Sequence, residues 1–416
     1  MSSLVIVGPV FTGTQYFDRG VVVVDQQKGV IVDVGKKGEV DEPKDAIRVT
    51  AEGGTILPGL IDAHLHLGST KAYGTVEWNM APEPYVAVRG VADLYRLFSA
   101  GFTTVRDMGT KVGTYLSRCV DEGLYEGPRV VACSKILSRT GGGDDLTILP
   151  IDMTEKFSYS YHSDGPWECR KAVRRVLRDG AKFVKIMNSA GDWLFPPPNG
   201  EWRHSDFTVE EVKAIVDEAH RAGLKVSAHA NGEESISDVV ESGVDSIDHG
   251  IGLTPEIAES MKKKGIFYCP TLTPFINTHE KERAVATLGN DSDWNKVIDI
   301  HFNHDMKLAK DFGLKIVAGT DMVGFVDAPH GGNYSEIVHL AKVFGNREAI
   351  VAATVTAAEC LGLGSCGQLK KGYEADIVVA KGNPLEDIEA LSPGNILHVI
   401  RKGRLHVKTS WISLVN

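Results

Sequence analysis

The sequence predicts an α/β fold: a (β/α)8 TIM barrel with a small β-sandwich domain that is built from both chain termini. Two observations carry this prediction. In the middle of the chain, short apolar runs alternate with longer stretches of helical period, which is typical of repeated βα units around a parallel sheet. At both ends, short β-like segments are separated by turn residues without a helical pattern. The predicted domains are residues 1–55 with 366–416 for the small domain and 56–365 for the barrel.

The strands of both predicted domains can be placed from apolar, β-branched runs. In the small domain they are expected at 4–7, 21–25, 30–34, 47–50, 375–380, 396–400 and 405–407. In the barrel they are expected at 59–66, 103–107, 129–134, 183–188, 225–229, 246–249, 266–271 and 315–321. Eight parallel strands that close on themselves form a TIM barrel, and roughly 300 residues lie within the usual size of that fold.

Helix signals separate the predicted barrel strands. Thr208 and Glu211 form a capping box, followed by apolar residues at helical spacing as far as Gly223. An earlier helix is expected to have one apolar stripe, formed by Ala172, Val173, Val176 and Leu177. Residues 189–207 depart from the βα rhythm as a long loop rich in Trp and Pro, which predicts a lid or binding loop.

The composition excludes several classes of protein. The net charge is −10, and Lys262–Lys264 is the one basic cluster of the sequence, so a nucleic-acid surface is not indicated. No window approaches the ~18 apolar residues of a membrane span, and no signal peptide is recognisable before Arg19. The six cysteines form no C-x-x-C pair, as in reduced thiols. We expect a cytoplasmic homo-oligomer that acts on a small molecule, without nucleic-acid or membrane partners.

Residues with metal-binding side chains end four of the predicted barrel strands. Reactive groups of a TIM barrel lie at these ends, where the βα loops open. His64 and His66 end the first strand and point to the same face, because a strand has a two-residue period. His229, His249 and Asp321 end the fifth, sixth and eighth strands. Each residue alone could be structural, but their joint placement predicts a metal centre.

Lys185, in the fourth predicted strand, is expected to face the same region. An ammonium group next to metal-binding imidazoles would suffer desolvation and like-charge repulsion. If the neutral amine instead reacts with CO₂, the resulting carbamate is an anion whose two oxygens can bridge two cations. The alternative is a lysine that reaches solvent or pairs with a carboxylate. Lys182, which lies nearer the strand start and on the opposite face, is not a candidate.

The sequence resembles the amidohydrolase superfamily over nearly its whole length. The motifs that carry the resemblance are PGLIDAHLH (58–66), GFTTVRD (101–107), FVKI (183–186), AHA (228–230), DHG (248–250), AGTD (318–321) and GYEADI (372–377). The resemblance implies two divalent metal ions: one held by His64, His66 and Asp321, the other by His229 and His249, and both bridged by Lys185 as N6-carboxylysine. Zinc is the default metal, although these ligands suit several others. CO₂ is needed for the lysine, and no organic cofactor is expected.

Within this superfamily, residues 164–185, 217–223 and 329–333 resemble the prolidase-related group of metal-dependent dipeptidases and carboxypeptidases. The resemblance implies cleavage of a C–N amide bond in a dipeptide, an N-acyl amino acid or a related amide or carbamate. The chain departs from that group at two places. It has Gly141-Gly142-Gly143-Asp144 where peptide-cleaving members commonly have Gly-Gly-His-Gly, and Asn231 where they have Tyr. These departures leave room for a bulkier or non-peptide amide.

The expected mechanism is attack of a metal-bridging hydroxide on the scissile carbonyl, with Asp321 as the proton shuttle to the leaving nitrogen. His204 and His330, in predicted loops, are candidates for assisting at the carbonyl oxygen. Arg106 and Asp107, at the end of the second strand, are predicted to form a structural ion pair rather than to touch substrate.

Two other functions stay open. One is a hydrolase that opens a cyclic amide, as hydantoinases and lactamases do, or an ester or lactone, on the same metal centre; the mass of the product, one piece or two, separates ring opening from amide cleavage. The other is a catalytically silent barrel scaffold, which is expected to lack metal ligands. None of the expected ligands is missing from this sequence.

Overall fold

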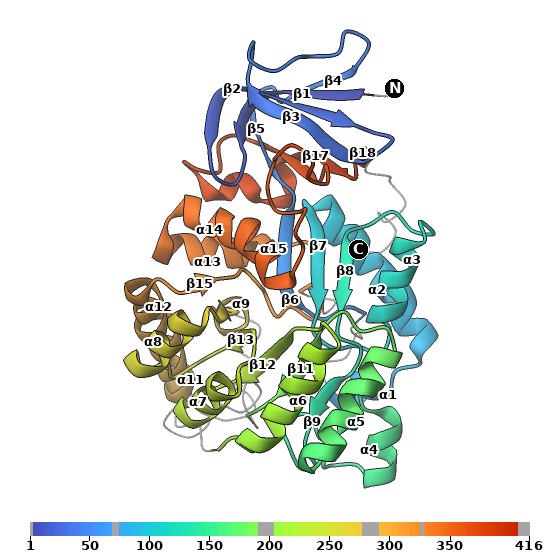
Figure 1. The fold of residues 1–416 in the computed structure, drawn as a ribbon, viewed down its shortest axis with the longest axis vertical. Coiled ribbons are helices and arrows are strands. Elements are labelled where there is room, and N and C mark those ends of the chain that lie inside the picture. Colours follow the sequence, from blue (N-terminus) through green and yellow to red (C-terminus); the bar gives the residue numbers. More distant parts are fainter. Residues whose placement is uncertain (1–2, 69–74, 190–203, 277–290, 325–327, 407–416) are drawn as a thin grey trace.

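The computed structural model describes residues 3–68, 75–189, 204–276, 291–324 and 328–406. The chain has an α/β structure in which a sheet from the two chain ends lies above a larger set of parallel strands and helices (Figure 1). Most of the predicted loop 189–207 (residues 190–203) and the end of the last predicted strand, Val407, lie outside the described residues. Among the described helices, none has the length and apolar character to cross a bilayer.

Both chain ends contribute to one mixed sheet. Its strands are β1 (Ser3–Phe11), β2 (Tyr16–Asp25), β3 (Val30–Lys36), β4 (Ile47–Thr50), β5 (Gly54–Pro58), β16 (Ile377–Lys381), β17 (Ile396–Arg401) and β18 (Arg404–His406). The strand order is β18-β17-β16-β5-β1-β2-β3, with β4 beside β1. The two ends meet where β16 pairs antiparallel with β5, with Val379 opposite Ile56. The predicted pairing of the termini is confirmed as one sheet, whereas strand β5 was not predicted.

Eight parallel strands lie where the sequence predicts barrel strands. They are β6 (Leu60–Leu65), β7 (Phe102–Asp107), β8 (Arg129–Ala132), β11 (Val184–Met187), β12 (Val226–Ala230), β13 (Ser246–His249), β14 (Phe267–Cys269) and β15 (Lys315–Ile316). They form a sheet β6-β7-β8 and a sheet that runs from β11 to β15. Backbone hydrogen bonds connect the two sheets at both edges, from Lys182 to Ala132 (2.8 Å) and from Ala63 to Ala318 (2.9 Å). The carboxyl ends of all eight strands therefore surround one region.

Two short strands extend the larger parallel sheet beyond β11. β9 (Ile136–Ser138) pairs in parallel with β10 (Ser160–His162), and Leu137 of β9 pairs with Ile186 of β11. Neither strand was predicted, because three residues are too few to show a period. They matter for the site because they hold residues 139–159 next to the carboxyl end of β11.

Helices alternate with the parallel strands, as predicted. They are α1 (Thr75–Met80), α2 (Glu83–Ser99), α3 (Gly113–Asp121), α4 (Ile151–Phe157), α5 (Gly165–Arg178), α6 (Val209–Arg221), α7 (Glu233–Ser242), α8 (Pro255–Lys264), α9 (Thr273–Ile276), α11 (Asp291–Ile298), α12 (Met306–Phe312), α13 (Tyr334–Phe344), α14 (Asn346–Ala352) and α15 (Val355–Leu361). The π-helical turn η2 (Asp299–Asp305) precedes α12, and the 3₁₀ turns η3 (Ile388–Leu391) and η4 (Pro393–Asn395) precede β17.

Local helix signals are largely confirmed. The capping box of Thr208 and Glu211 is present in both directions at the start of α6. The stripe of α5 is correct for Ala172, Val173 and Val176, which are buried. It is wrong for Leu177, which is 43% exposed, because at about 100° per residue its side chain lies roughly 40° beyond Val173, past the edge of the buried stripe.

Apolar side chains form two main cores. The larger core lies between the parallel strands and their helices and includes Val105, Ile186 and Val212, all fully buried. A separate core under the terminal sheet includes Ile6 and Val379. Full burial of such a side chain contributes about 1.5–3 kcal/mol. The six cysteines are free thiols and five of them are buried, as predicted.

Candidate metal centre

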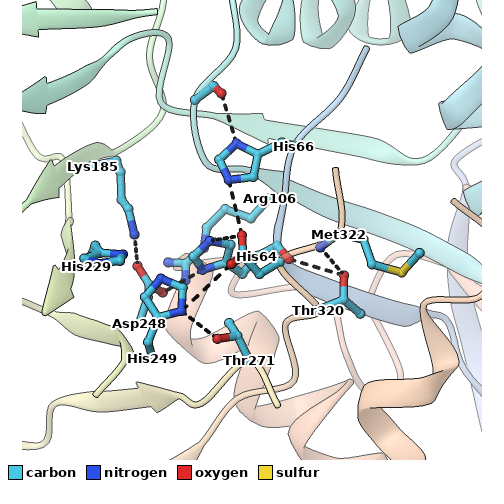
Figure 2. A network of polar contacts seen from close by, with 12 residues as sticks. His64, His66, Arg106, Lys185, His229, Asp248, His249, Thr271, Thr320 and Met322 are labelled. Carbon is cyan, nitrogen blue, oxygen red and sulfur yellow. Dashed lines mark hydrogen bonds and ion pairs between the residues drawn. The ribbon is translucent and has the colours of Figure 1, made fainter. Parts of the chain in front are cut away.

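Six side chains predicted to bind metal converge at the carboxyl ends of the parallel strands, and Figure 2 labels five of them. They are His64, His66, Lys185, His229, His249 and Asp321. The His249 ring lies 4.3 Å from the His229 ring and 5.1 Å from the His64 ring. Most of these side chains are almost completely buried, but His66 and Asp321 keep 12% and 11% exposure. Solvent therefore reaches the cluster on the side of these two residues.

Three of the six offer their ligand atoms to one point. Asp321 Oδ1 lies 3.1 Å from His64 Nε2 and 3.3 Å from His66 Nε2. The three groups could together hold one ion. His66 Nδ1 lies 3.0 Å from the Gly109 carbonyl oxygen, which only accepts, so Nδ1 must carry the hydrogen. In the neutral ring, Nε2 is then a bare acceptor that faces a carboxylate oxygen.

Two facing acceptors repel each other unless a cation lies between them. The cation can be a proton or a metal ion, and histidines that bind metals commonly donate their second ring nitrogen to a carbonyl or carboxylate, as His66 does. His64 points its Nε2 toward Asp321, and its Nδ1 lies 3.3 Å from Asp248 Oδ1, close enough for an ion pair but without a hydrogen bond. The donor set and its outer partners therefore fit a divalent metal ion.

The charges of the cluster agree with this donor set. Burial opposes ionisation of Asp321, but the imidazoles of His64 and His66 outweigh it and hold the pKa of Asp321 well below its usual value. Burial and the neighbouring His229 keep the pKa of His249 well below its usual value. His249 is thus neutral, the form that binds metals. Burial lowers the pKa of His66, but the facing Asp321 raises it more, so that a proton can occupy the metal's place.

Two of these side chains reach the cluster through an unusual backbone conformation. His249 has φ +65° and Asp321 has φ +54°, in the left-handed region that residues other than glycine rarely adopt. In a regular strand, Asp248 and His249 would point to opposite faces. The turn of the chain at His249 lets both contact the cluster. Such conformations cost about 1–3 kcal/mol and gather at functional sites.

Asp248 is a central residue that the sequence analysis quoted within a motif but did not assign. It is fully buried beneath the cluster and accepts hydrogen bonds from Lys185 Nζ at 2.5 Å, Ser227 Oγ at 2.7 Å and Arg106 Nη2 at 3.3 Å. Burial raises the pKa of Asp248, but the positive charges of Lys185, His64 and Arg106 lower it by more. The pKa therefore lies well below its usual value. The available signal in the sequence was its position directly before His249 in a predicted strand. Neighbouring strand residues point to opposite faces, so this position did not predict that Asp248 and His249 share a cluster.

Lys185 is buried and its amine pairs with Asp248. This is the alternative that the sequence left open, a lysine paired with a carboxylate. Lys185 and His229 come from the neighbouring strands β11 and β12, and both are drawn in Figure 2. Lys182 is exposed, in agreement with its exclusion.

The structure contradicts the predicted ion pair between Arg106 and Asp107. Arg106 pairs with Asp248 and donates to the Ala63 carbonyl at 2.5 Å. Asp107 accepts from the Leu67 backbone at 3.1 Å and from Thr110 Oγ1 at 2.9 Å. Neighbouring residues of a strand point to opposite faces, so the two side chains cannot meet. Arg106 and Asp107 both have buried contacts within the fold, which agrees with a structural role for each.

The two candidate loop histidines lie in different surroundings. The His204 side chain is 82% exposed and lies 3.8 Å from Glu234, and among the described residues no contact joins it to the cluster. His330 is buried and its Nε2 donates to the His66 carbonyl at 2.9 Å, while Asn333 lies 3.4 Å from its Nδ1. His330 therefore holds the backbone of a predicted metal ligand.

Gly319 leaves no room for a side chain at the point where the segment after β15 crosses β6. An added Cβ would lie 2.5 Å from Cys269 Sγ, 2.6 Å from His64 Cβ and 2.8 Å from His64 N. We expect Gly319→Ala to displace His64, to destabilise the fold by about 1–3 kcal/mol and to reduce the metal content. Thermal unfolding and metal analysis measure this. Gly364→Ala, which meets nothing within 4 Å, is the control, and equal effects of both variants would contradict the prediction.

Comparisons with known proteins agree with this arrangement. A family model described as the amidohydrolase family matches residues 55–406. Ochratoxinase from Aspergillus niger is 31% identical over 397 residues, covering 88% of this chain and 79% of that protein. Its crystal structure superposes with a TM-score of 0.86, covering 98% of this chain and 96% of that one.

Two peptide-cleaving proteins are similarly close in structure. A prolidase in complex with N-methylphosphonate-L-proline is 30% identical with a TM-score of 0.84. A Xaa-Pro dipeptidase with bound methionine is 29% identical with a TM-score of 0.83. Each comparison covers 98% of this chain and all of the other chain.

Proposed function

The chain belongs to the amidohydrolase family, and we propose that it is a hydrolase that uses two divalent metal ions to cleave a C–N amide bond. The observation that carries the proposal is the meeting of two histidine nitrogens and one carboxylate oxygen at a single point beside two further imidazoles. The similarity to ochratoxinase and to prolidases supports an amide as the scissile bond.

We assign the ligands by their positions around the cluster. His64, His66 and Asp321 would hold one ion, and His229 and His249 would hold the second. Lys185 as N6-carboxylysine would bridge them. Carboxylation replaces a positive charge by a negative one, so the modified side chain would leave Asp248 and turn to the cations. Asp248 would keep Arg106, Ser227 and His64 as partners, which supports this exchange.

When bound, two such ions supply a nucleophile by lowering the pKa of a water molecule, and they polarise the substrate carbonyl. The residues of the chain contribute orientation and proton transfer. Asp321 is partly exposed and its carboxylate is held ionised, so it can accept the proton of the attacking water and return it to the leaving nitrogen. His330 positions His66 through its carbonyl. His204 remains a candidate for the carbonyl oxygen only if its exposed side chain changes position.

The substrate class follows from the relatives as a proposal. We propose a dipeptide, an N-acyl amino acid or a related amide or carbamate. Opening of a cyclic amide, or cleavage of an ester or lactone, on the same centre is the second candidate. Metal ligands gathered at one point favour an enzyme over a silent scaffold.

We also propose the finer architecture and setting. Residues 56–365 would form a closed (β/α)8 barrel, and residues 1–55 with 366–416 a small β-sandwich domain. The hydrogen bonds that join the two parallel sheets at both edges support closure. Zinc is proposed as the metal, because imidazole and carboxylate ligands suit it. Six free cysteines fit the reducing cytoplasm. The homo-oligomer remains a prediction.

Removal of the metal tests the proposal directly. After dialysis against a chelator, we expect hydrolysis to disappear and to return when zinc, manganese or cobalt is added, with about two ions per chain. Hydrolysis is measured with a set of possible substrates: Xaa-Pro and Xaa-Arg dipeptides, N-acyl amino acids, aryl amides, carbamates and lactones. Full turnover by a metal-free protein would exclude this mechanism.

A further inference from the structure

Asp144 ends the segment Gly141–Asp144, which departs from the Gly-Gly-His-Gly of the peptide-cleaving group, and the proposed mechanism does not use it. The segment follows β9 and is held by Asp206, which accepts from the Gly143 backbone at 2.7 Å and pairs with Arg139 at 3.2 Å. The Asp206 backbone in turn donates to the Asn188 carbonyl, just after β11, at 2.8 Å. The position of Asp144 is therefore set by hydrogen bonds to the strand that carries Lys185.

The carboxylate of Asp144 is held by neutral donors. Ser160 Oγ donates to Asp144 Oδ2, and the Tyr159 hydroxyl also forms a hydrogen bond with this carboxylate. In the part of the chain that the structure describes, no Lys, Arg or His forms an ion pair with Asp144. A carboxylate only accepts hydrogen bonds, and two hydroxyl donors leave some of its acceptor sites unused.

A chain of ring contacts joins Asp144 to the metal centre. Tyr159, which bonds Asp144, packs against Trp78 with ring centroids 4.9 Å apart. Trp78 in turn lies 5.5 Å from the His66 ring, edge to face. Trp78 and Asp144 keep partial exposure, as do His66 and Asp321. The ring contacts through Trp78 and Tyr159 therefore place Asp144 toward the His66 side of the centre.

The electrostatic surroundings agree with this placement. Burial raises the pKa of Asp144 to about 7, against the opposing effects of Tyr159, His66 and Lys185. Although the residue keeps partial exposure, its carboxylate is thus poorly solvated and feels the charges of His66 and Lys185. A substrate cation would supply a counter-charge that Asp144 does not receive through an ion pair with the described residues.

We propose that Asp144 recognises a protonated amine of the substrate, so that the enzyme prefers unblocked α-amino amides and dipeptides to their N-acylated forms. The proposal rests on the proposed function, because it places the amine next to the scissile amide at the same centre. An ammonium group would bring a positive charge and further hydrogen-bond donors to the Asp144 carboxylate, in addition to the hydroxyls of Ser160 and Tyr159. An N-acyl group removes the charge and adds bulk beside Trp78.

Paired ligands test the preference separately from turnover. The probes are glycyl-L-proline and L-alanyl-L-phenylalanine, each with a free and an N-acetylated amine, and phosphinate mimics of the same four compounds. Hydrolysis is followed for the dipeptides, and Kd is measured by calorimetry for the mimics, all on metal-loaded protein. We expect the free amines to bind about 10- to 100-fold more tightly than the acetylated forms, as for one charge-assisted hydrogen bond.

The variant Asp144→Asn keeps the shape and removes the charge. We expect it to lose most of this preference while the Kd of the acetylated mimics changes less than about threefold. Asp145→Asn, a neighbouring carboxylate that accepts from the Gly141 backbone, is the matched control and is expected to keep the preference. Metal content and thermal unfolding show that each variant is folded.

The outcomes distinguish the two proposals. Equal Kd values for free and acetylated mimics in the unsubstituted protein, or an equal loss for both in Asp144→Asn, would overturn the role of Asp144 while leaving amide hydrolysis intact. A preserved preference in binding without hydrolysis of any amide would support Asp144 and contradict the proposed function.

Discussion

Replacing Lys185 by alanine is expected to remove bound metal and to lower kcat/KM by about 10³-fold or more. The side chain is buried and its amine pairs with Asp248, and Figure 2 shows no other described lysine in the cluster. Without its carbamate, two cations would face each other with no bridging anion. Metals per chain and kcat/KM are the measurements.

A short carboxylic acid such as propionate is expected to rescue part of the activity, because its two oxygens can occupy the space of the missing carbamate. Lys182→Ala is the control: the residue is exposed, three positions earlier, and is expected to leave metal content and turnover unchanged. If Lys185→Ala keeps its metal and full turnover, the bridging role is wrong.

The second large effect is expected on stability. In Asp248→Asn, Lys185 and Arg106 would remain buried without their counter-charge. Removing one partner of a buried ion pair costs about 3–5 kcal/mol, so the free energy of unfolding of the metal-free protein is expected to fall by this amount. Urea unfolding at pH 7 measures it. Asp217→Asn, which breaks an exposed pair with Arg170, is the control and is expected to change stability far less.

The difference in free energy of unfolding between the unsubstituted protein and Asp248→Asn is expected to change with pH in one direction. In the folded protein the pKa of Asp248 lies well below its usual value, whereas in the unfolded chain it is about 4. The stabilisation of the folded protein by ionised Asp248 is therefore fully present above about pH 4. The contribution is lost as the pH falls through the folded pKa. The gap between the two proteins is therefore expected to persist at pH 5 and to narrow only in stronger acid. A gap that is absent at pH 7 would show that Arg106 and Lys185 do not depend on Asp248.

The order of the elements and the candidate metal ligands were predictable from local patterns. The eight parallel strands lie at the predicted runs, and the box of Thr208 and Glu211 starts a helix as expected. His64 and His66 share a face because a strand repeats every two residues, and strand ends of parallel units meet at one edge. These signals are periodic, so a window of a few residues contains them.

Other features depended on contacts between distant segments. Asp248 and His249 both reach the cluster because the chain turns at φ +65°, which strand alternation does not foresee. Asp144 meets Tyr159 because two three-residue strands, too short to show a period, set their segments side by side.

The sequence by itself thus determined which strands form and which of their ends carry imidazoles and carboxylates, since alternation and helical period are local properties of the chain. The tertiary structure decided which of these groups face each other: Arg106 turns to Asp248 rather than Asp107, and His330 to the carbonyl of His66. Partners of a buried charge are chosen by the packing of separate strands, and no local pattern contains that information.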